Sequence, residues 1–519
     1  FSGHGAEDGR YRFQWTAPIA LSPHDSKVVY HGGNVLFRTT DGGQTWNAIS
    51  PDLTRNDKSK QKWSGGPITG DNTGAEHYCT IFAVAESPRE KGLIWTGSDD
   101  GLVHVTRDGG SHWTNVTASI PRLPEWGTVT TIEPSPFDAG TAYVVVDAHR
   151  MDDARPYLWK TADYGKTWKS LVAGLPADVY LHAVREDPKK RGQLYLGTER
   201  GVSFSPDDGA TWRELKLNLP TVAVHDLVVK ADDLVVGTHG RSIWILDDLT
   251  AVREWSPAVA EKPDHLFSIQ PAIRWRIAEA LTNHVKGPGE NPPVGAVIQY
   301  ALKAKPKTDV TLEIQDGGGQ TIRTLSSKKQ EPEEPEDAPD AGEGDKPTVL
   351  SLEPGVQRVV WDLRYEGANW IRKARVDSGN PKKGPLALPG RFTAKLTVDG
   401  ETLSAPLEVR PDPRGKVPPG DLEEQFRFAV SLRDEVSRLT GIVNQVRSVR
   451  DQLRSAKERL ATDAQAAPLL KLGEDLVRKC DALEDRLHNP SAEVTYDILA
   501  MRGGTRLYSK LVPLYTWAD

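Results

Sequence analysis

The chain has 519 residues and a net charge of −7, with 15 tryptophans but only 2 methionines and 2 cysteines. A mildly acidic chain lacks the basic surface expected of a nucleic-acid-binding protein, and no apolar run approaches the roughly 20 residues that a membrane helix needs. The length predicts three or so domains of roughly 150 residues each.

A motif returns four times within residues 1–258. The copies are "TTDGGQTW", "TRDGGSHW", "TADYGKTW" and "SPDDGATW". Short apolar strands broken by glycine lie between them, so each unit is predicted to be a four-stranded meander whose fourth strand starts at the tryptophan. A fifth unit, residues 224–248, keeps the strands without the motif. Such repeats predict a β-propeller, and five are few for a closed ring, so the ring is small or takes blades from elsewhere.

The residues of the motif are predicted to be structural. A short carboxylate caps the N–H groups of a turn, glycine adopts backbone conformations closed to other residues, and tryptophan supplies buried area. Four equivalent acids spread around a ring do not converge on one site. The residues interpreted in this way are Asp41, Trp46, Asp108, Trp113, Asp163, Trp168, Asp207 and Trp212.

The four copies resemble Asp-boxes, the repeat of BNR or sortilin-type propellers that also occurs in sialidases and two-propeller xyloglucanases. Longer segments such as "RPYLWKTADYGKTW" and "LYLGTERGVSFSPDDGATW" are similar to bacterial extracytoplasmic proteins described as BNR-repeat, sortilin-like or glycosyl-hydrolase-like. The resemblance implies that each box lies between the third and fourth strands of a blade. It also implies a periplasmic or secreted protein, although this chain starts at Phe1 without a signal peptide. Such proteins commonly carry a further propeller on the N-terminal side.

If the boxes occupy those turns, the loops between strands two and three and the entries to strand one open on the opposite face. Acids, imidazoles, arginines and aromatics meeting there would suit a sugar, a peptide or a ligand with a carboxylate. For any single residue, the common alternative is an exposed ion pair or a hydrogen-bonded core histidine. The candidate ligand-binding residues are His77, Asp99, Asp100, His149, Arg150, Asp152, Asp153, Tyr180, His182, Glu199, Arg200, His225, His239 and Arg241.

Two further domains are predicted after the repeats. Alternating strands between Pro/Gly turns over residues 262–411 predict an immunoglobulin-like β-sandwich, with a solvated acidic loop at 330–345. Residues 418–519 are predicted to form an α-helical hairpin or small bundle. Its first helix would start at a capping box of Asp421 and Glu424, the second near Pro468, and the third would run from about Ala492 to Val512.

Three functions remain open on this pattern. The first is a recognition or scaffold module with a glycan, peptide or protein partner. The second is a glycoside hydrolase using two carboxylates on the open face, although no arginine triad of the sialidase type is present and no pair of acids can be named. The third is a subunit of a larger assembly. Cys79 and Cys480 fall in different predicted domains, so a disulfide between them is not expected, and they show no metal-ligand spacing. No cofactor and no metal are expected.

Overall fold

The chain folds into two compact units, Phe1–Trp255 and Ser256–Asp519. The finer division of residues 256–519 into a sandwich and a helical domain stays a prediction. Where the structure is described, no helix is both long and apolar enough to cross a lipid bilayer. This computed structural model describes residues 6–7, 9–65, 68–70, 73–276, 291–328, 348–376, 378–492, 497 and 504–518, a set that leaves out the acidic segment 330–345.

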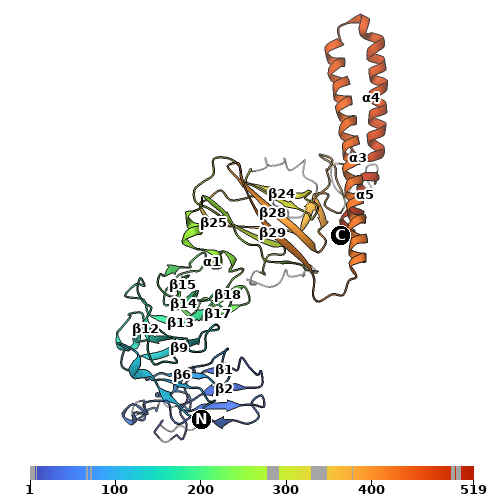
Figure 1. Cartoon of the computed structure of the whole chain (residues 1–519). Helices are drawn as coiled ribbons and strands as arrows, with labels where there is room; N and C mark the ends of the chain where they lie inside the picture. Colours follow the sequence, from blue (N-terminus) through green and yellow to red (C-terminus); the bar gives the residue numbers. More distant parts are fainter. Residues whose placement is uncertain are drawn as a thin grey trace. The chain divides into compact units, whose positions relative to one another are not determined.

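Antiparallel four-stranded sheets follow one another along the first unit (Figure 1). Strands that are consecutive in the sequence are neighbours in each sheet, as the meander pattern predicts. Repeated sheets of this kind fit a β-propeller. The strands are β1 (Ile19–Leu21), β2 (Val29–Gly32), β3 (Leu36–Thr39) and β4 (Asn47–Ala48); β5 (Ile81–Glu86), β6 (Ile94–Ser98), β7 (Val103–Thr106) and β8 (Thr114–Asn115); β9 (Thr128–Pro134), β10 (Ala142–Asp147), β11 (Leu158–Thr161) and β12 (Lys169–Ser170); β13 (Leu181–Glu186), β14 (Leu194–Thr198), β15 (Gly201–Ser205) and β16 (Arg213–Glu214).

The fifth sheet is smaller than the others. It consists of β17 (Val224–Lys230), β18 (Asp233–Thr238) and β19 (Ile243–Leu246), so the expectation of a four-stranded unit is wrong here. The motif that turns the chain into a fourth strand is missing from this unit, and the chain enters the short helix α1 (Thr250–Glu254) instead.

The hydrophobic core of the first unit lies between successive sheets. One cluster joins Trp95 of β6 to Val129 of β9, and another joins Leu158 of β11 to Leu194 of β14. The first strand of each sheet also contacts the first strand of the next. Because middle strands such as β6 and β14 are covered on both faces, every residue in them is buried. This explains why they appear in the sequence as short apolar runs rather than as alternating patterns.

Each motif forms one closed turn between the third and fourth strands of its sheet. In the first copy, the Thr39 hydroxyl donates to Asp41 Oδ1 at 2.7 Å and accepts from the Gly43 amide at 2.9 Å. The amide and hydroxyl of Thr45 donate to the same carboxylate, at 2.9 and 2.7 Å. Gly43 has a φ of +96°, in the region that glycine tolerates best. The spacing of the motif is therefore the spacing of these hydrogen bonds.

The motif also joins neighbouring sheets. The indole N–H of Trp113 donates to the Ile49 carbonyl at 3.0 Å, and that of Trp212 donates to the Leu171 carbonyl at 2.8 Å. Both acceptors directly follow the fourth strand of the preceding sheet. A Cβ at Gly110 would lie 2.5 Å from the same Ile49 carbonyl oxygen, so only glycine fits at this contact.

The second unit begins with helix α2 (Pro257–Glu261) and contains two larger sheets around a shared core that includes Trp361 and Phe392. Strand β21 (Ala272–Arg274) runs parallel to β29 (Glu401–Pro411), whereas the other pairings within these two sheets are antiparallel. A separate ribbon pairs β26 (Arg364–Glu366) with β27 (Lys383–Leu386). One sheet has the order β20 (Asp264–Leu266), β22 (Ala296–Leu302), β25 (Gly355–Trp361), and the other has the order β21 (Ala272–Arg274), β29 (Glu401–Pro411), β28 (Gly390–Val398), β23 (Thr311–Gln315), β24 (Thr321–Ser326).

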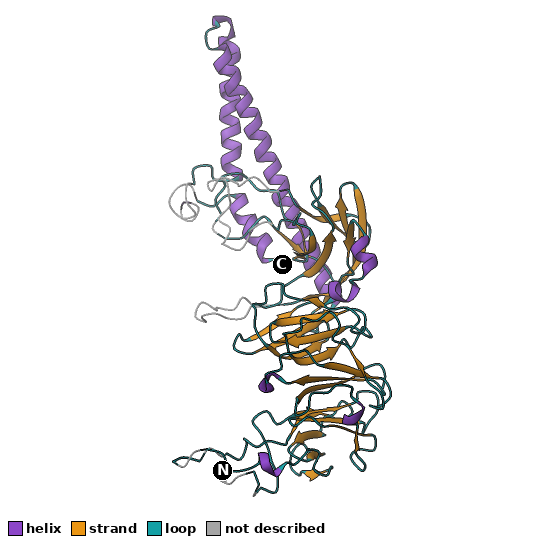
Figure 2. Ribbon diagram, turned by 90° about the vertical axis from the view of Figure 1, so that its left-hand side faces the viewer, coloured by secondary structure: helices purple, strands orange, loops and turns teal. Residues whose placement is uncertain are grey.

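Two long helices, α3 (Pro419–Leu460) and α4 (Ala467–Leu487), lie side by side in the second unit (Figure 2). The carboxylate of Glu484, only 2% exposed, accepts from Arg447 Nε at 2.7 Å and from Arg450 Nη1 at 2.5 Å. His488 Nε2 lies 2.9 Å from the same carboxylate. A buried carboxylate needs such partners, and together they fix the lengthwise position of α4 on α3.

The helix boundaries differ from the predicted ones. α3 starts at Pro419 and no side chain caps it, so the predicted capping box at Asp421 is wrong. A proline suits the first turn of a helix because its missing N–H would have no partner there. Helix α5 (Leu507–Trp517) runs beyond the predicted end at Val512, continuing through a proline. Most of the earlier part of the predicted third helix lies outside the described residues.

The hydrogen bonds of the motif turns predict a distinct response to acid. The bond from the Thr45 amide, then those from the hydroxyls of Thr39 and Thr45, lower the pKa of Asp41 to about 2. The turn bonds likewise lower the pKa of Asp108 and Asp163. Burial raises the pKa of Asp207, but hydrogen bonds from its turn outweigh burial and the pKa is lowered.

A carboxylate with a lowered folded-state pKa stabilises the fold above its unfolded pKa of about 4, and this stability is lost as pH falls further. We expect a variant with all four aspartates changed to asparagine to melt below wild type at pH 7, and the difference to shrink between pH 4 and pH 2. Thermal unfolding across this range measures the difference. Glu214→Gln, at an exposed position of β16, is the control. A difference that stays constant with pH would contradict the expectation.

Candidate functional site

The first strands of four successive sheets carry one extra residue, a β-bulge, at equivalent points. The pairing of β13 with β14 shifts at His182, and the pairing of β17 with β18 shifts at His225. The same shift falls at Phe82 in β5 and at Thr130 in β9. Bulges redirect a side chain and are frequent beside binding sites. Two of these four redirected side chains are histidines, both among the predicted ligand-binding residues.

A glycine in the second strand brings these bulged strands together. A Cβ at Gly197 of β14 would lie 2.4 Å from the carbonyl oxygen of Val224 in β17, closer than real Cβ atoms come. Since glycine has no Cβ, β17 can lie directly against β14. The rings of His182 and His225 thus become neighbours, with centroids 4.2 Å apart.

The structure places six of the predicted residues in one group, here called the histidine cluster. The ring of His149 stacks on Tyr180 with centroids 4.5 Å apart, and Tyr180 meets His182 edge-on at 5.2 Å. The rings of His225 and His239 follow at 4.6 Å. Residues from three sheets thereby form one continuous aromatic line. The members are His149, Tyr180, His182, Glu199, His225 and His239.

Two carboxylates anchor the cluster. His182 Nε2 lies 3.0 Å from Glu199 Oε2, and His149 Nδ1 lies 2.6 Å from Asp147 Oδ2. The side chain of His182 is 10% exposed and that of Glu199 is 38% exposed, whereas His225 is an exposed residue. The inner members are therefore held in place while the outer ones meet solvent. Such a surface offers hydrogen-bond donors, acceptors and flat rings to a ligand.

The protonation states within the cluster are coupled. The neighbouring rings partly shield His225 from water, and this desolvation, followed by the charges of His182 and His239, lowers its pKa. Burial raises the pKa of Glu199, but hydrogen bonds from His182 and Tyr180 outweigh it and the pKa is lowered. Burial and the bond to Glu199 raise the pKa of Tyr180 to about 12. At neutral pH, Glu199 is thus an anion, His225 is neutral and Tyr180 keeps its proton.

A repeated backbone bond places equivalent side chains at this end of three of the sheets. The amide of Asp99 donates to the Thr80 carbonyl at 2.9 Å, and the amides of Glu199 and His239 make the equivalent bond in their own sheets. Each of the three residues stands two positions after a glycine in its second strand. The repeated dipeptides Gly-Ser and Gly-Thr in the sequence mark the residues that make this bond, and could have shown that these positions are equivalent.

Asp99 does not join the histidine cluster. Its carboxylate accepts from the amide and the hydroxyl of Thr80, both at 2.8 Å, and from Gln14 Nε2 at 3.3 Å. The residue is 5% exposed, and burial raises the pKa of its carboxyl to about 7. A group so enclosed braces its own loop and offers little surface to a ligand.

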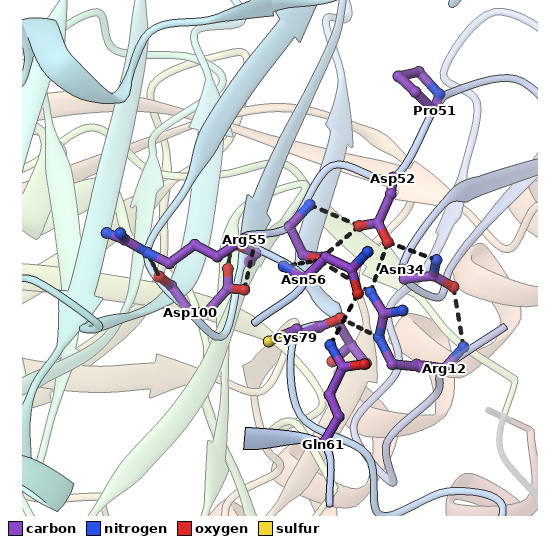
Figure 3. Close-up of polar contacts among 12 residues, drawn as sticks. Arg12, Asn34, Pro51, Asp52, Arg55, Asn56, Gln61, Cys79 and Asp100 are labelled. Carbon is purple, nitrogen blue, oxygen red and sulfur yellow. Dashed lines mark hydrogen bonds and ion pairs between the residues drawn. The ribbon is translucent and has the colours of Figure 1, made fainter. Parts of the chain in front are cut away.

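Asp100 is fully buried in a polar network of the first two sheets (Figure 3). Its carboxylate accepts from the Arg55 amide at 2.8 Å, and its carbonyl accepts from Arg55 Nε at 2.7 Å. Close by, the buried guanidinium of Arg12 donates to Asp52 at 2.7 Å and to the Cys79 carbonyl at 3.2 Å. This network could not be recognised from the sequence, because its members lie far apart in the chain.

The remaining predicted residues take ordinary surface or loop roles. Asp153 is bound by Arg155 and by the Tyr157 hydroxyl, and Arg200 pairs with Asp178. His77 has a pKa lowered by burial and then by the charge of Arg12. The expected group of His149, Arg150, Asp152 and Asp153 therefore contributes His149 to the histidine cluster, while Arg150, Asp152 and Arg241 lie exposed.

No family model matches the chain. A probable oligoxyloglucan-reducing end-specific xyloglucanase of Neosartorya fischeri is 26% identical over 172 residues, which are 30% of this chain and 20% of that protein. Vacuolar protein sorting/targeting protein 10 of Laccaria bicolor is 33% identical over 108 residues, 20% of this chain and 6% of that protein. The chain thus spans a fifth or less of the length of either relative.

The chain also has low similarity to solved structures, both in sequence and in backbone geometry. The crystal structure of the GH74 xyloglucanase from Xanthomonas campestris has a TM-score of 0.35 and 14% sequence identity, over 74% of this chain and 63% of that chain.

The close packing at Gly197 leads to a prediction about stability. We expect Gly197→Ala to lower the free energy of unfolding by about 1–3 kcal/mol, because the new methyl group must displace β17. Chemical unfolding followed by tryptophan fluorescence measures the loss. Gly74→Ala is the matched control, since a Cβ there meets no atom within 4 Å. Equal stability of the two variants would show that the sheets are not held at this distance.

Proposed function

We propose that the protein is an extracytoplasmic recognition module that binds a glycan, a peptide or a protein partner at the histidine cluster. The observation that carries this proposal is the continuous line of rings from His149 to His239, part of it open to solvent. Flat rings bordered by hydrogen-bonding groups suit ligands with hydroxyl, amide or carboxylate groups.

The position of the cluster in the sheets supports the same proposal. Its residues come from the entries to first strands and from the connections between second and third strands, whereas the motif turns join third and fourth strands. In an antiparallel meander these two sets of connections lie at opposite ends of the sheet. We propose that the motif turns are Asp-boxes that brace one rim, and that the other rim recognises the ligand. An immunoglobulin-like sandwich (262–411) and a helical hairpin (418–519) for assembly belong to the same proposal.

A glycoside hydrolase is the second candidate, favoured by the partial similarity to a probable xyloglucanase. Such an enzyme needs two carboxylates that reach the substrate. Asp99 is 5% exposed, and Asp153 is bound by Arg155 and Tyr157. Glu199 and Asp147 hold histidines of the cluster. Because internal bonds already engage these acids, binding is the better supported function.

A subunit of a larger assembly is the third candidate. The first sheet exposes Ile19 and Leu21, which are 72% and 69% exposed, and the fifth sheet exposes Ile243 and Ile245, at 68% and 58%. Exposed apolar side chains on both the first and the last sheet of the unit favour contact with a protein partner. A scattering mass well above 57.1 kDa for the isolated chain would support this candidate.

Binding to oligosaccharide and peptide arrays tests the recognition proposal. We expect wild type to bind one of these ligand classes, and the double variant His149→Ala, Tyr180→Ala to lose at least about tenfold in affinity, because both stacked rings are removed. Lys166→Ala, an exposed residue in a motif turn, is the control and should bind like wild type.

The outcomes separate the candidates. Array binding that the double variant retains, or the absence of binding by wild type, would overturn the recognition proposal. Release of reducing sugar from xyloglucan oligosaccharides that is lost in Asp99→Asn or Asp153→Asn, but kept in Asp41→Ala, would establish the hydrolase instead.

A further inference from the structure

Three residues of the histidine cluster have the donor set and the spacing of a metal site. His182, Glu199 and His225 each offer one ligand atom, and these atoms lie within 4.8 Å of one another. Two imidazoles and a carboxylate form a set that zinc and iron(II) take in proteins. We propose that His182, Glu199 and His225 bind one divalent first-row transition metal ion. This departs from the expectation of no metal, which rested on cysteine spacing alone.

The distances are close to what an ion requires. Ligand atoms at about 2.0–2.2 Å from a tetrahedral zinc ion lie about 3.3 Å from one another. His182 Nε2 and Glu199 Oε2 are 3.0 Å apart, so this pair already has the right separation. All three ligand atoms lie within 4.8 Å of one another, and His225 is an exposed residue, so a turn of its ring would bring its nitrogen to the ion.

The backbone around the site holds the ligands at these positions. The carbonyl of His182 accepts from the Thr131 hydroxyl at 2.9 Å, and this bond ties the bulge at His182 to the preceding sheet. The amide of Glu199 donates to the Tyr180 carbonyl at 3.2 Å.

The ion would keep open coordination positions. Three protein ligands leave at least one position of a tetrahedral ion for an outside group. His225 and the neighbouring His239, whose ring centroids are 4.6 Å apart, are both exposed residues. A ligand carboxylate, imidazole or hydroxyl could therefore reach the ion. The site itself does not depend on the recognition proposal, because it is tested with the metal alone.

Titration of tag-free protein, first stripped with a chelator, tests the proposal by calorimetry with Zn²⁺. We expect one ion per chain in wild type. His182→Ala and His225→Ala should weaken binding at least about tenfold, and so should Glu199→Gln, which keeps a hydrogen-bonding group but loses the charge. His112→Thr is the matched control, because His112 Nδ1 also lies against a carboxylate, at 2.6 Å from Asp108 Oδ2, and the other three copies of the motif have Thr at this position.

Binding near one ion per chain that is lost in the three variants and kept in the control supports the site. Wild type without such binding, or full binding in His182→Ala and His225→Ala, overturns it. Circular dichroism verifies that each variant folds. If an alanine variant does not fold, the visible absorption spectrum of Co²⁺ bound to wild type decides, since histidine and carboxylate ligands in four- or five-coordination give intense bands and Co²⁺ in water does not.

Discussion

The first unit depends on how closely one sheet lies on the next. Where a side chain would normally separate two strands, Gly197 allows the Val224 carbonyl to take its place, and Gly97 lets the side chain of Val129 do the same. A larger spacing would move the first strands apart and with them the bulged residues. The close approach of the His182 and His225 rings, from two neighbouring sheets, follows from the contact at Gly197.

The two ends of each sheet carry different kinds of chemistry. At one end, the polar side chains of the motif form hydrogen bonds within their own turn, as Thr39 and Thr45 do with Asp41. At the other end, the same backbone hydrogen bond recurs from sheet to sheet, but the residue whose amide donates it differs, being Asp99 in one sheet and Glu199 in another. A fixed frame with variable side chains is the usual arrangement by which a rigid scaffold presents binding residues on its loops.

The repeats and their strands could be predicted because the motif encodes bonds between residues only two to four positions apart. The candidate face could be predicted as a set of loops, but not which members would meet. Asp100 turns inward because Arg55, 45 residues earlier, provides its partners. His225 turns outward because of a register shift between β17 and β18, which exists only once the strands pair. Long-range pairing of this kind leaves no mark within a short window of sequence.

The tryptophan bonds between sheets also bear on how the chain reaches its fold. The carbonyl that follows the fourth strand receives its indole donor only when the next sheet arrives, as with Ile49 and Trp113 or Leu171 and Trp212. Each sheet is built from a short continuous segment and completed by its successor. During synthesis the N-terminal sheets emerge first. The sheets of such a chain can form one after another during synthesis, and each new sheet supplies the indole donor that the preceding sheet lacks.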